Sequence, residues 1–345
     1  MSRNKQVTIN PEHFEASFKV IDAHTQGEFT RIVYDGLFPE PVGKTMLEKK
    51  HYVSDNYDHY RRALMDEPRG HKDMFGSLWT EPVNPEADFG AIFMDGTGYL
   101  PMCGHGSMGS ATAAVETGIV KATEPYTHVT IDAPAGLIRA KVKVEQGKAK
   151  AVSITNVPSF LYQENLEIQI EGGKIKYDLA FAGNFVALIN VEQLGIKVAK
   201  DNLTELVELG IKLLTAINAE ISVNHPQLAI NEVGTCNFYE RIESEEVNYR
   251  NVVVFGNHQA DRSPSGSGTS ALLAMLYAKG KLELKEMFIN ESIIGTRFEG
   301  ILLAEKQVGE YTAVIPQITG SSNITGLATY LIDPDDRLKY GFQLN

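Results

Sequence analysis

The sequence predicts an α+β fold in which β-strands outnumber α-helices. Several segments alternate apolar and polar residues with the period of two that is typical of half-buried strands, whereas few segments have helical spacing. The strand-like segments follow one another as hairpins, without the regular strand–helix–strand spacing of a doubly wound sheet. A glycine-rich helix opening also occurs twice, which predicts two similar halves.

The clearest strand signal lies at 137–145, LIRAKVKVE. Its apolar residues share one face of a strand and its basic residues share the other, the apolar ones being Ile138, Ala140, Val142 and Val144. The sequence EQGKAK then predicts a turn, and a second alternating stretch follows over 151–157. The two stretches together predict a β-hairpin.

One helix and one further strand can be read in the second part of the chain. Residues 203–217, LTELVELGIKLLTAI, have apolar residues at helical spacing, and Asn202 with Glu205 has the form of a capping box. Residues 247–256, VNYRNVVVFG, predict a strand that leads toward a glycine-rich stretch.

The two glycine-rich stretches match position by position. Residues 101–109 read PMCGHGSMG and residues 263–271 read SPSGSGTSA. The aligned pairs are Cys103 with Ser265, Gly104 with Gly266, His105 with Ser267, Gly106 with Gly268 and Ser107 with Thr269. The copies lie nearly half the chain apart, so each is expected to open the central helix of one half.

We therefore predict two halves, each with strands around a central helix. The N-terminal half is expected to span 1–158 and to carry Cys103, and residues 330–345 are expected to return to it. The C-terminal half is expected to span 159–329 and to carry Asp261 and Ser265. A chain of 345 residues is long enough for two domains of ordinary size.

Composition excludes several classes of function. Acidic residues outnumber basic ones, 44 to 32, and the formal net charge is −12. Nucleic acids and anionic membrane surfaces select basic patches, so we expect neither as a partner. Two cysteines are too few for a disulfide framework, and neither a secretion signal nor a membrane-spanning run is evident. We expect a cytoplasmic protein that acts on a small molecule.

The stretch Cys-Gly-His-Gly at the start of a helix has defined chemistry. The first N–H groups of a helix have no intrahelical partner and carry a partial positive charge, which favours anions. Glycines at 104 and 266 let a carboxylate approach the backbone closely. A helix N-terminus also lowers the pKa of a thiol, so Cys103 is a candidate base or nucleophile. The alternative is a buried, inert cysteine.

Other motifs carry weaker signals. Neither glycine-rich copy has the form of a nucleotide-binding loop, and no nucleophile elbow of a serine hydrolase occurs. His24, His71 and His105 lack the spacing of metal ligands, so we expect no metal site. Cys236 is expected in a strand as a small apolar residue. Asp261 either caps a turn or provides a negative charge for an ammonium group.

The sequence resembles the proline racemase family, which includes hydroxyproline 2-epimerases and trans-3-hydroxy-L-proline dehydratases. The two glycine-rich stretches, with DRSP before the second, carry the resemblance. Further matching stretches are IDAHTQGEFTRIV (21–33), EPRGHKDMFG (67–76), DAPAGLI (132–138), ESIIGTRFEG (291–300) and ITG (324–326). The resemblance implies a fold similar to diaminopimelate epimerase, with two pseudo-symmetric halves and the active site between them.

The resemblance also implies roles for residues. It implies chemistry without a cofactor on a cyclic imino acid, and a possible homodimer. Cys103 is implied as the base on one face of Cα, and His105 and Asp261 as contacts of the ring nitrogen. The two helix openings, Gly104–His105 and Gly266–Ser267, are expected to bind the substrate carboxylate and to take up charge as the Cα proton leaves.

In the sequence, Ser265 is the residue that distinguishes inversion at Cα from dehydration. Inversion needs an acid and a base on opposite faces of Cα, and racemases of the family resemble one another in having two cysteines. A serine hydroxyl is a far weaker acid than a thiol, and nothing near it in sequence is an activating base. Dehydration of trans-3-hydroxy-L-proline to Δ1-pyrroline-2-carboxylate needs only one thiol, although family dehydratases carry threonine at this position.

We therefore expect a lyase, a trans-3-hydroxy-L-proline dehydratase, with Cys103 as base and Ser265 as its partner. The alternative is an isomerase, either a proline racemase or a 4-hydroxyproline 2-epimerase. Ser265 could also replace a native cysteine in an engineered, inactive racemase. A more distant alternative is a non-catalytic protein that binds imino acids, which would have no use for the Cys103 thiol.

Overall fold

The computed structural model describes residues 9–36, 40–171 and 173–344. These residues form four α-helices, three short 3-10 helices and eighteen strands, which confirms a mixed fold with many strands and few helices. The helices are α1 (Met46–Met65), α2 (Gly104–Glu116), α3 (Leu203–Glu220) and α4 (Gly266–Ala278), with η1 (Pro11–His13), η2 (Val191–Leu194) and η3 (Lys200–Asn202). Among them, no helix is long and apolar enough to cross a membrane.

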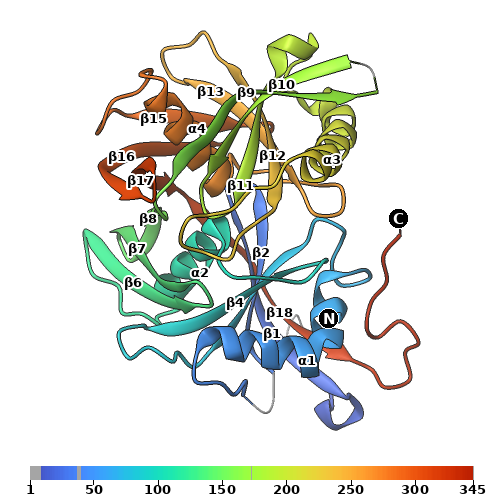
Figure 1. Ribbon diagram of the computed structural model, residues 1–345. Coiled ribbons are helices and arrows are strands. Elements are labelled where there is room, and N and C mark those ends of the chain that lie inside the picture. The colour runs from blue at the N-terminus through green and yellow to red at the C-terminus, as the bar shows by residue number, and fades with distance from the viewer. Residues whose placement is uncertain (1–8, 37–39, 172, 345) are drawn as a thin grey trace, which may run out of the picture.

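One set of strands surrounds α2, as Figure 1 shows in its lower part. The strands of this set are β1 (Ala16–Thr25), β2 (Glu28–Asp35), β3 (Phe75–Thr80), β4 (Phe89–Asp95), β5 (Tyr99–Leu100), β6 (Tyr126–Ala133), β7 (Gly136–Glu145), β8 (Lys148–Thr155) and β18 (Ser322–Ile332). β2 pairs with β3, and β4 with β6, in parallel; the other pairings within the set are antiparallel.

A second set surrounds α4, in the upper part of Figure 1. Its strands are β9 (Phe160–Ile170), β10 (Gly173–Phe181), β11 (Phe185–Asn190), β12 (Val233–Arg241), β13 (Tyr249–Phe255), β14 (Gln259–Ala260), β15 (Phe288–Ser292), β16 (Arg297–Val308) and β17 (Tyr311–Gly320). The parallel pairs are β11 with β12 and β13 with β15. The order of parallel and antiparallel pairs along the chain is therefore the same in both sets.

The two sets are joined where the chain passes from one to the other, after β8 and after β17, and by one strand pair. β8 pairs with β17. β9 follows β8 but pairs with β10, and β18 follows β17 but pairs with β1 over Ala16–Thr25. The predicted boundary at 158 falls between β8 and β9, whereas the predicted return at 330 falls inside β18, which begins at Ser322. Apolar alternation in 322–332 is weak because most of its residues are exposed or half-buried.

Most of the elements predicted from periodicity are confirmed. The predicted hairpin is β7 with β8, which pair antiparallel. The predicted strand at 247–256 is β13, and Cys236 is buried in β12. The predicted helix is α3, but the capping box is wrong. The Asn202 side chain makes no cap hydrogen bond and donates instead to the Lys197 carbonyl, because η3 runs directly into α3.

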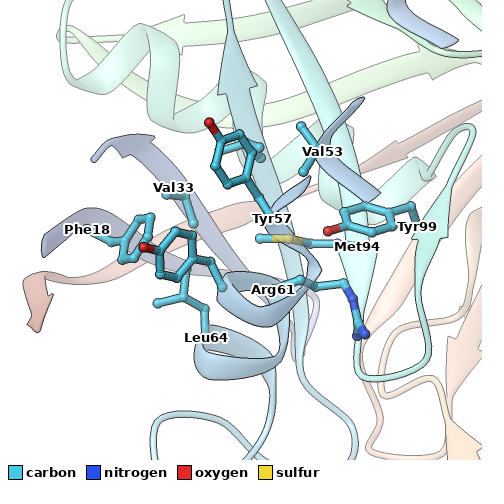
Figure 2. A pocket seen from close by; sticks show the side chains of 10 residues that line it. Phe18, Val33, Val53, Tyr57, Arg61, Leu64, Met94 and Tyr99 are labelled. Atoms are coloured by element: carbon cyan, nitrogen blue, oxygen red, sulfur yellow. The ribbon is translucent and has the colours of Figure 1, made fainter. Parts of the chain in front are cut away.

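Helix α1 covers one face of the first set of strands. Figure 2 shows apolar and aromatic side chains between this helix and the strands, around a small hollow. Its lining residues are Phe18, Val33, Val53, Tyr57, Tyr60, Arg61, Leu64, Leu78, Met94 and Tyr99. None of the residues predicted to carry function lines this hollow, so we assign it to packing.

A buried amide network fixes the segment that leads into α4. Asn251 donates to the Asn237 side chain at 2.9 Å and to the Pro264 carbonyl at 3.0 Å, and accepts from Asn290 at 3.0 Å. Asn237 in turn donates to the Gly268 carbonyl in the first turn of α4 at 3.1 Å. Buried amides of this kind are costly to leave unpaired, so the network determines where the chain turns before Ser265.

Asn251→Ala is expected to lower the free energy of unfolding by at least about 2 kcal/mol, because it removes three buried hydrogen bonds and leaves the Asn237 side-chain oxygen without a partner. Chemical denaturation measures the change. Asn323→Ala, at an exposed position of β18, is the matched control and should change stability by less than about 0.5 kcal/mol. Equal stability of the two variants would show that the network does not stabilise the fold.

Candidate active site

The first residues of α2 and α4 face each other across the two sets of strands. A Cβ atom added to Gly104 would lie 3.5 Å from the Gly266 Cα, and one added to Gly266 would lie 3.6 Å from the Gly104 Cα. Any larger side chain at either position would therefore extend into the space between the helices. The structure thus brings together the two glycine-rich stretches that the sequence repeats.

Cys103 is the N-cap residue of α2. Its backbone is extended, and its Sγ accepts a hydrogen bond from the Gly106 N–H at 3.4 Å. The same sulfur lies 3.3 Å from Nδ1 of His105. His105 is itself buried, with its ring against Phe75 and its carbonyl accepting from the Thr25 hydroxyl at 2.9 Å. These contacts hold the thiol at the N-terminus of α2.

The expectation that the helix start makes this thiol easy to ionise is wrong for the free protein. Burial raises the pKa of Cys103, and the negative charge of Asp261 raises it further, as Glu28 does when it is ionised. The Gly106 N–H lowers the pKa, as expected for a helix N-terminus, but this effect is smaller than that of burial. Burial also lowers the pKa of His105, which keeps the neighbouring imidazole uncharged at neutral pH.

Ser265 occupies the same capping position on α4, with a different backbone. Its Oγ accepts from the Gly268 N–H at 3.2 Å and lies 3.3 Å from the Ser267 hydroxyl. Its φ is 61°, in a region that non-glycine residues rarely adopt and that costs about 1–3 kcal/mol. Within the described ranges, no imidazole or carboxylate hydrogen-bonds this hydroxyl. Ser265 is therefore positioned as a capping hydroxyl without an activating base.

Asp261 lies buried in the segment before α4. Its Oδ1 accepts from the backbone N–H of Ser263 at 2.8 Å and from the Ser263 hydroxyl at 2.7 Å. The Ser263 hydroxyl in turn accepts from the Ser265 N–H at 3.1 Å. Both proposed sequence roles of Asp261 are compatible with this geometry, because one carboxylate oxygen closes the turn and the other makes no side-chain hydrogen bond to a described residue.

Three charged residues near the site were not singled out by sequence reasoning. Glu28 is buried, and its Oε2 accepts from the Arg262 N–H at 2.7 Å. The Arg262 guanidinium forms an ion pair with Asp73 at 2.7 Å. Glu28 and Arg262 are 234 residues apart in sequence, so no spacing rule could have paired them. The available signal was the stretch 21–33, which carried the family resemblance without assigning a role to Glu28.

Glu28 is an unusual carboxyl because it is buried and, among the described residues, forms no ion pair with a lysine or arginine side chain. Burial is the largest cause that raises its pKa well above the ordinary carboxyl value, followed by the negative charge of Asp261. It follows a tight turn in which both Gln26 and Gly27 have positive φ, as in the hairpin turns that match strand twist. The hairpin from Thr25 to Glu28 therefore contacts both α2, through His105, and the approach to α4, through Arg262.

His24 and His71, the other two histidines considered in the sequence, make local hydrogen bonds. Nδ1 of His24 accepts from the Gly27 N–H at 3.1 Å, and Nδ1 of His71 accepts from the Asp73 N–H at 3.2 Å. Each imidazole thus closes a turn of its own loop. In the part of the chain that the structure describes, no group of three or more His, Cys, Asp or Glu residues is arranged to hold a metal ion.

The reactivity of Cys103 should depend on pH in a defined direction. Because burial raises the pKa of the thiol, iodoacetamide should alkylate Cys103 at neutral pH at least about tenfold more slowly than a cysteine in a short peptide. Raising the pH should accelerate alkylation. Asp261→Asn should move the profile to lower pH, because it removes a negative charge. Mass spectrometry of the Cys103 peptide measures the rate, and fast alkylation at neutral pH would contradict the prediction.

Comparisons with known proteins identify the family of this chain. The sequence model of the family described as Proline racemase matches residues 20–343. The chain is 52% identical to the proline racemase of Clostridioides difficile, over 96% of this chain and 99% of that protein. It is 40% identical to the trans-3-hydroxy-L-proline dehydratase of Azospirillum brasilense, over 94% of this chain and 98% of that protein. A crystal structure of a hydroxyproline epimerase from Agrobacterium vitis with bound trans-4-hydroxy-L-proline superimposes with a TM-score of 0.87 at 32% identity, covering 96% of this chain and 97% of that one. The chain therefore belongs to the proline racemase family of enzymes.

Proposed function

We propose that this enzyme inverts the configuration at Cα of proline or 4-hydroxyproline, as a racemase or 2-epimerase. The observation that carries the proposal is the facing pair of helix starts, with the Cys103 thiol capping one and the Ser265 hydroxyl capping the other. A planar carbanion between them would have a proton-transferring group on each face. Inversion requires this arrangement.

The substrate carboxylate fits between the two helix starts. The first N–H groups of each helix lack intrahelical partners, and caps use only those of Gly106 and Gly268. The N–H groups of Gly104, His105, Gly266 and Ser267 are then available to a carboxylate that approaches between the glycines. These donors would also stabilise the charge that moves onto the carboxylate when Cα loses its proton.

The ring nitrogen is assigned to Asp261 and His105. The buried Asp261 carboxylate would balance the charge of the substrate ammonium, and the uncharged imidazole of His105 would accept one of its N–H groups. The binding of this cation would also offset the negative charge of Asp261, which raises the pKa of Cys103. Substrate binding thus favours the thiolate, and the thiol proton passes to solvent. The thiolate then removes the Cα proton and becomes a thiol again, while the electron pair moves toward the carboxylate.

The ranking of reactions differs from the one that the sequence alone suggests. From the sequence alone, dehydration was the expected reaction, because Ser265 stands where family racemases have a second cysteine. The named relatives support inversion better, because the protein called proline racemase shares 52% identity with this chain and the protein called dehydratase shares 40%. On the second face, the Ser265 hydroxyl, which lies 3.3 Å from the Ser267 hydroxyl, is the group from which Cα would receive its proton.

Dehydration of trans-3-hydroxy-L-proline is the second candidate. The observation that favours it is the absence, among the described residues, of a base that hydrogen-bonds the Ser265 hydroxyl. A single thiolate can remove the Cα proton while the 3-hydroxyl leaves as water, giving an enamine that tautomerises to Δ1-pyrroline-2-carboxylate. This reaction places no demand on the second face.

We also propose that the site lies between two halves of related structure. Residues 1–158 with β18 would form one, and the remainder from 159 would form the other. The recurring order of parallel and antiparallel strand pairs supports this division, as does the equal length of α2 and α4, 13 residues each. In this arrangement each half contributes one helix start, and neither half alone would contain a complete site.

A proton NMR time course in D2O distinguishes the reactions. L-proline, trans-4-hydroxy-L-proline and trans-3-hydroxy-L-proline are incubated separately with the enzyme. We expect deuterium at Cα and build-up of the opposite configuration from one of the first two substrates. Conversion of only the 3-hydroxy substrate would overturn inversion in favour of dehydration. Cys103→Ala should lose at least about 100-fold in rate, whereas Cys236→Ala, which removes the buried cysteine of β12, should remain active.

Ser265→Cys tests the second face. A thiol is a much stronger acid than a hydroxyl, so this variant should invert L-proline at least about tenfold faster than the parent enzyme. The kcat/KM for D-proline should rise by the same factor as that for L-proline, because the equilibrium constant of racemisation is one. Ser267→Cys is the matched control and should not accelerate inversion. An unchanged rate in a folded Ser265→Cys protein would show that position 265 does not donate the proton.

A further inference from the structure

Glu28 is a buried carboxyl that the proposed reaction does not use. It begins β2, directly after the Gln26–Gly27 turn, and only 2% of its surface is exposed. Its Oε2 is fixed by the Arg262 N–H at 2.7 Å, so the carboxyl lies beside the segment that carries Asp261. A glutamate is rarely buried to this extent without a charged partner.

The charges around Glu28 do not balance within the protein. The groups that act on it most strongly are Asp261, Arg262 and Asp73. The Arg262 guanidinium binds Asp73 and the Ala260 carbonyl, each at 2.7 Å, and Lys72 also pairs with Asp73 at 3.1 Å. Across the described residues, neither Glu28 nor Asp261 forms an ion pair with a lysine or arginine side chain.

Two neighbouring carboxyls without a cation cannot both be charged at low cost. Burying a second negative charge beside the first is opposed by desolvation and by repulsion. The other titratable groups near them are Cys103 and His105 on α2 and His71 in the loop that carries Asp73, and none of these is a permanent cation. The free protein therefore needs a proton on one carboxyl. Asp261 accepts two hydrogen bonds from Ser263 and Glu28 accepts one from Arg262, so Glu28 is the one that retains the proton.

We propose that Glu28 releases this proton to solvent when the ammonium group of the substrate binds beside Asp261. The ammonium then lies between two carboxylates, and it supplies the positive charge that the protein lacks. The inference rests on the proposed function, and it adds that the enzyme selects ligands with a cationic ring nitrogen. The step is balanced: Glu28 passes from carboxylic acid to carboxylate, the proton enters the buffer, and the ligand keeps both N–H groups.

Calorimetry in buffers of different ionisation enthalpy tests the proposal. Binding of L-proline to Cys103→Ala protein is measured at neutral pH in phosphate and in Tris, because this variant has neither turnover nor a thiol proton to release. The dependence of the heat on the buffer gives the number of protons exchanged. We expect release approaching about one proton per site.

Two matched controls isolate Glu28. The double variant Cys103→Ala/Glu28→Gln keeps an oxygen that can accept from Arg262 N–H, but has no proton to release, so its binding heat should not depend on the buffer. Tetrahydrofuran-2-carboxylate has a ring oxygen in place of the ammonium, and should bind Cys103→Ala protein at least about tenfold more weakly and without proton release. Circular dichroism of both variants checks the fold.

Other results would overturn the proposal. Binding of L-proline to Cys103→Ala without proton exchange would show that Glu28 has the same charge in the free protein and in the complex. Equal proton release from the double variant would assign the proton to another group, such as the ligand itself. If the parent enzyme acts on none of the three substrates in the NMR experiment and does not bind L-proline, the proposed function fails and this inference fails with it.

Discussion

The close approach of two helix N-termini is the constraint on which the site depends. The positive ends of α2 and α4 point toward each other with a glycine at each start, and Gly104 and Gly266 are close enough that a Cβ on either would contact the other. Two like partial charges at this distance repel. A buried anion between them relieves the repulsion, so the fold itself favours an anionic ligand at this position.

The surrounding structure determines how the two helices meet. Each helix is enclosed by its own set of strands, and the crossings of β9 and β18 join the sets. Capping side chains use one N–H of each first turn, and the Asn237, Asn251 and Asn290 amides fix the segment before α4. The strained backbone of Ser265 is tolerated because these contacts on both sides specify its conformation.

Negative charge is concentrated beside the positive helix ends. Burial and the negative charge of Asp261 raise the pKa of the Cys103 thiol, so this thiol stays protonated in the free protein. A zwitterionic imino acid complements both features, because its carboxylate matches the helix ends and its ammonium matches the carboxyls. Binding of such a ligand would remove the effect that suppresses the thiolate. The same arrangement would therefore keep the Cys103 thiol protonated in the free protein and favour the thiolate in the proposed complex.

The sequence alone determined the local features of this protein. The repeated glycine-rich stretch predicted two helix starts, and the structure has them at Gly104 and Gly266, because a helix start depends on residues within one turn. Alternation predicted the β7–β8 hairpin for the same reason. Only the tertiary structure decided which distant groups meet: Glu28 with Arg262, β18 with β1, and the net pKa of Cys103. These depend on burial and on charges brought together from opposite ends of the chain, which no local pattern records.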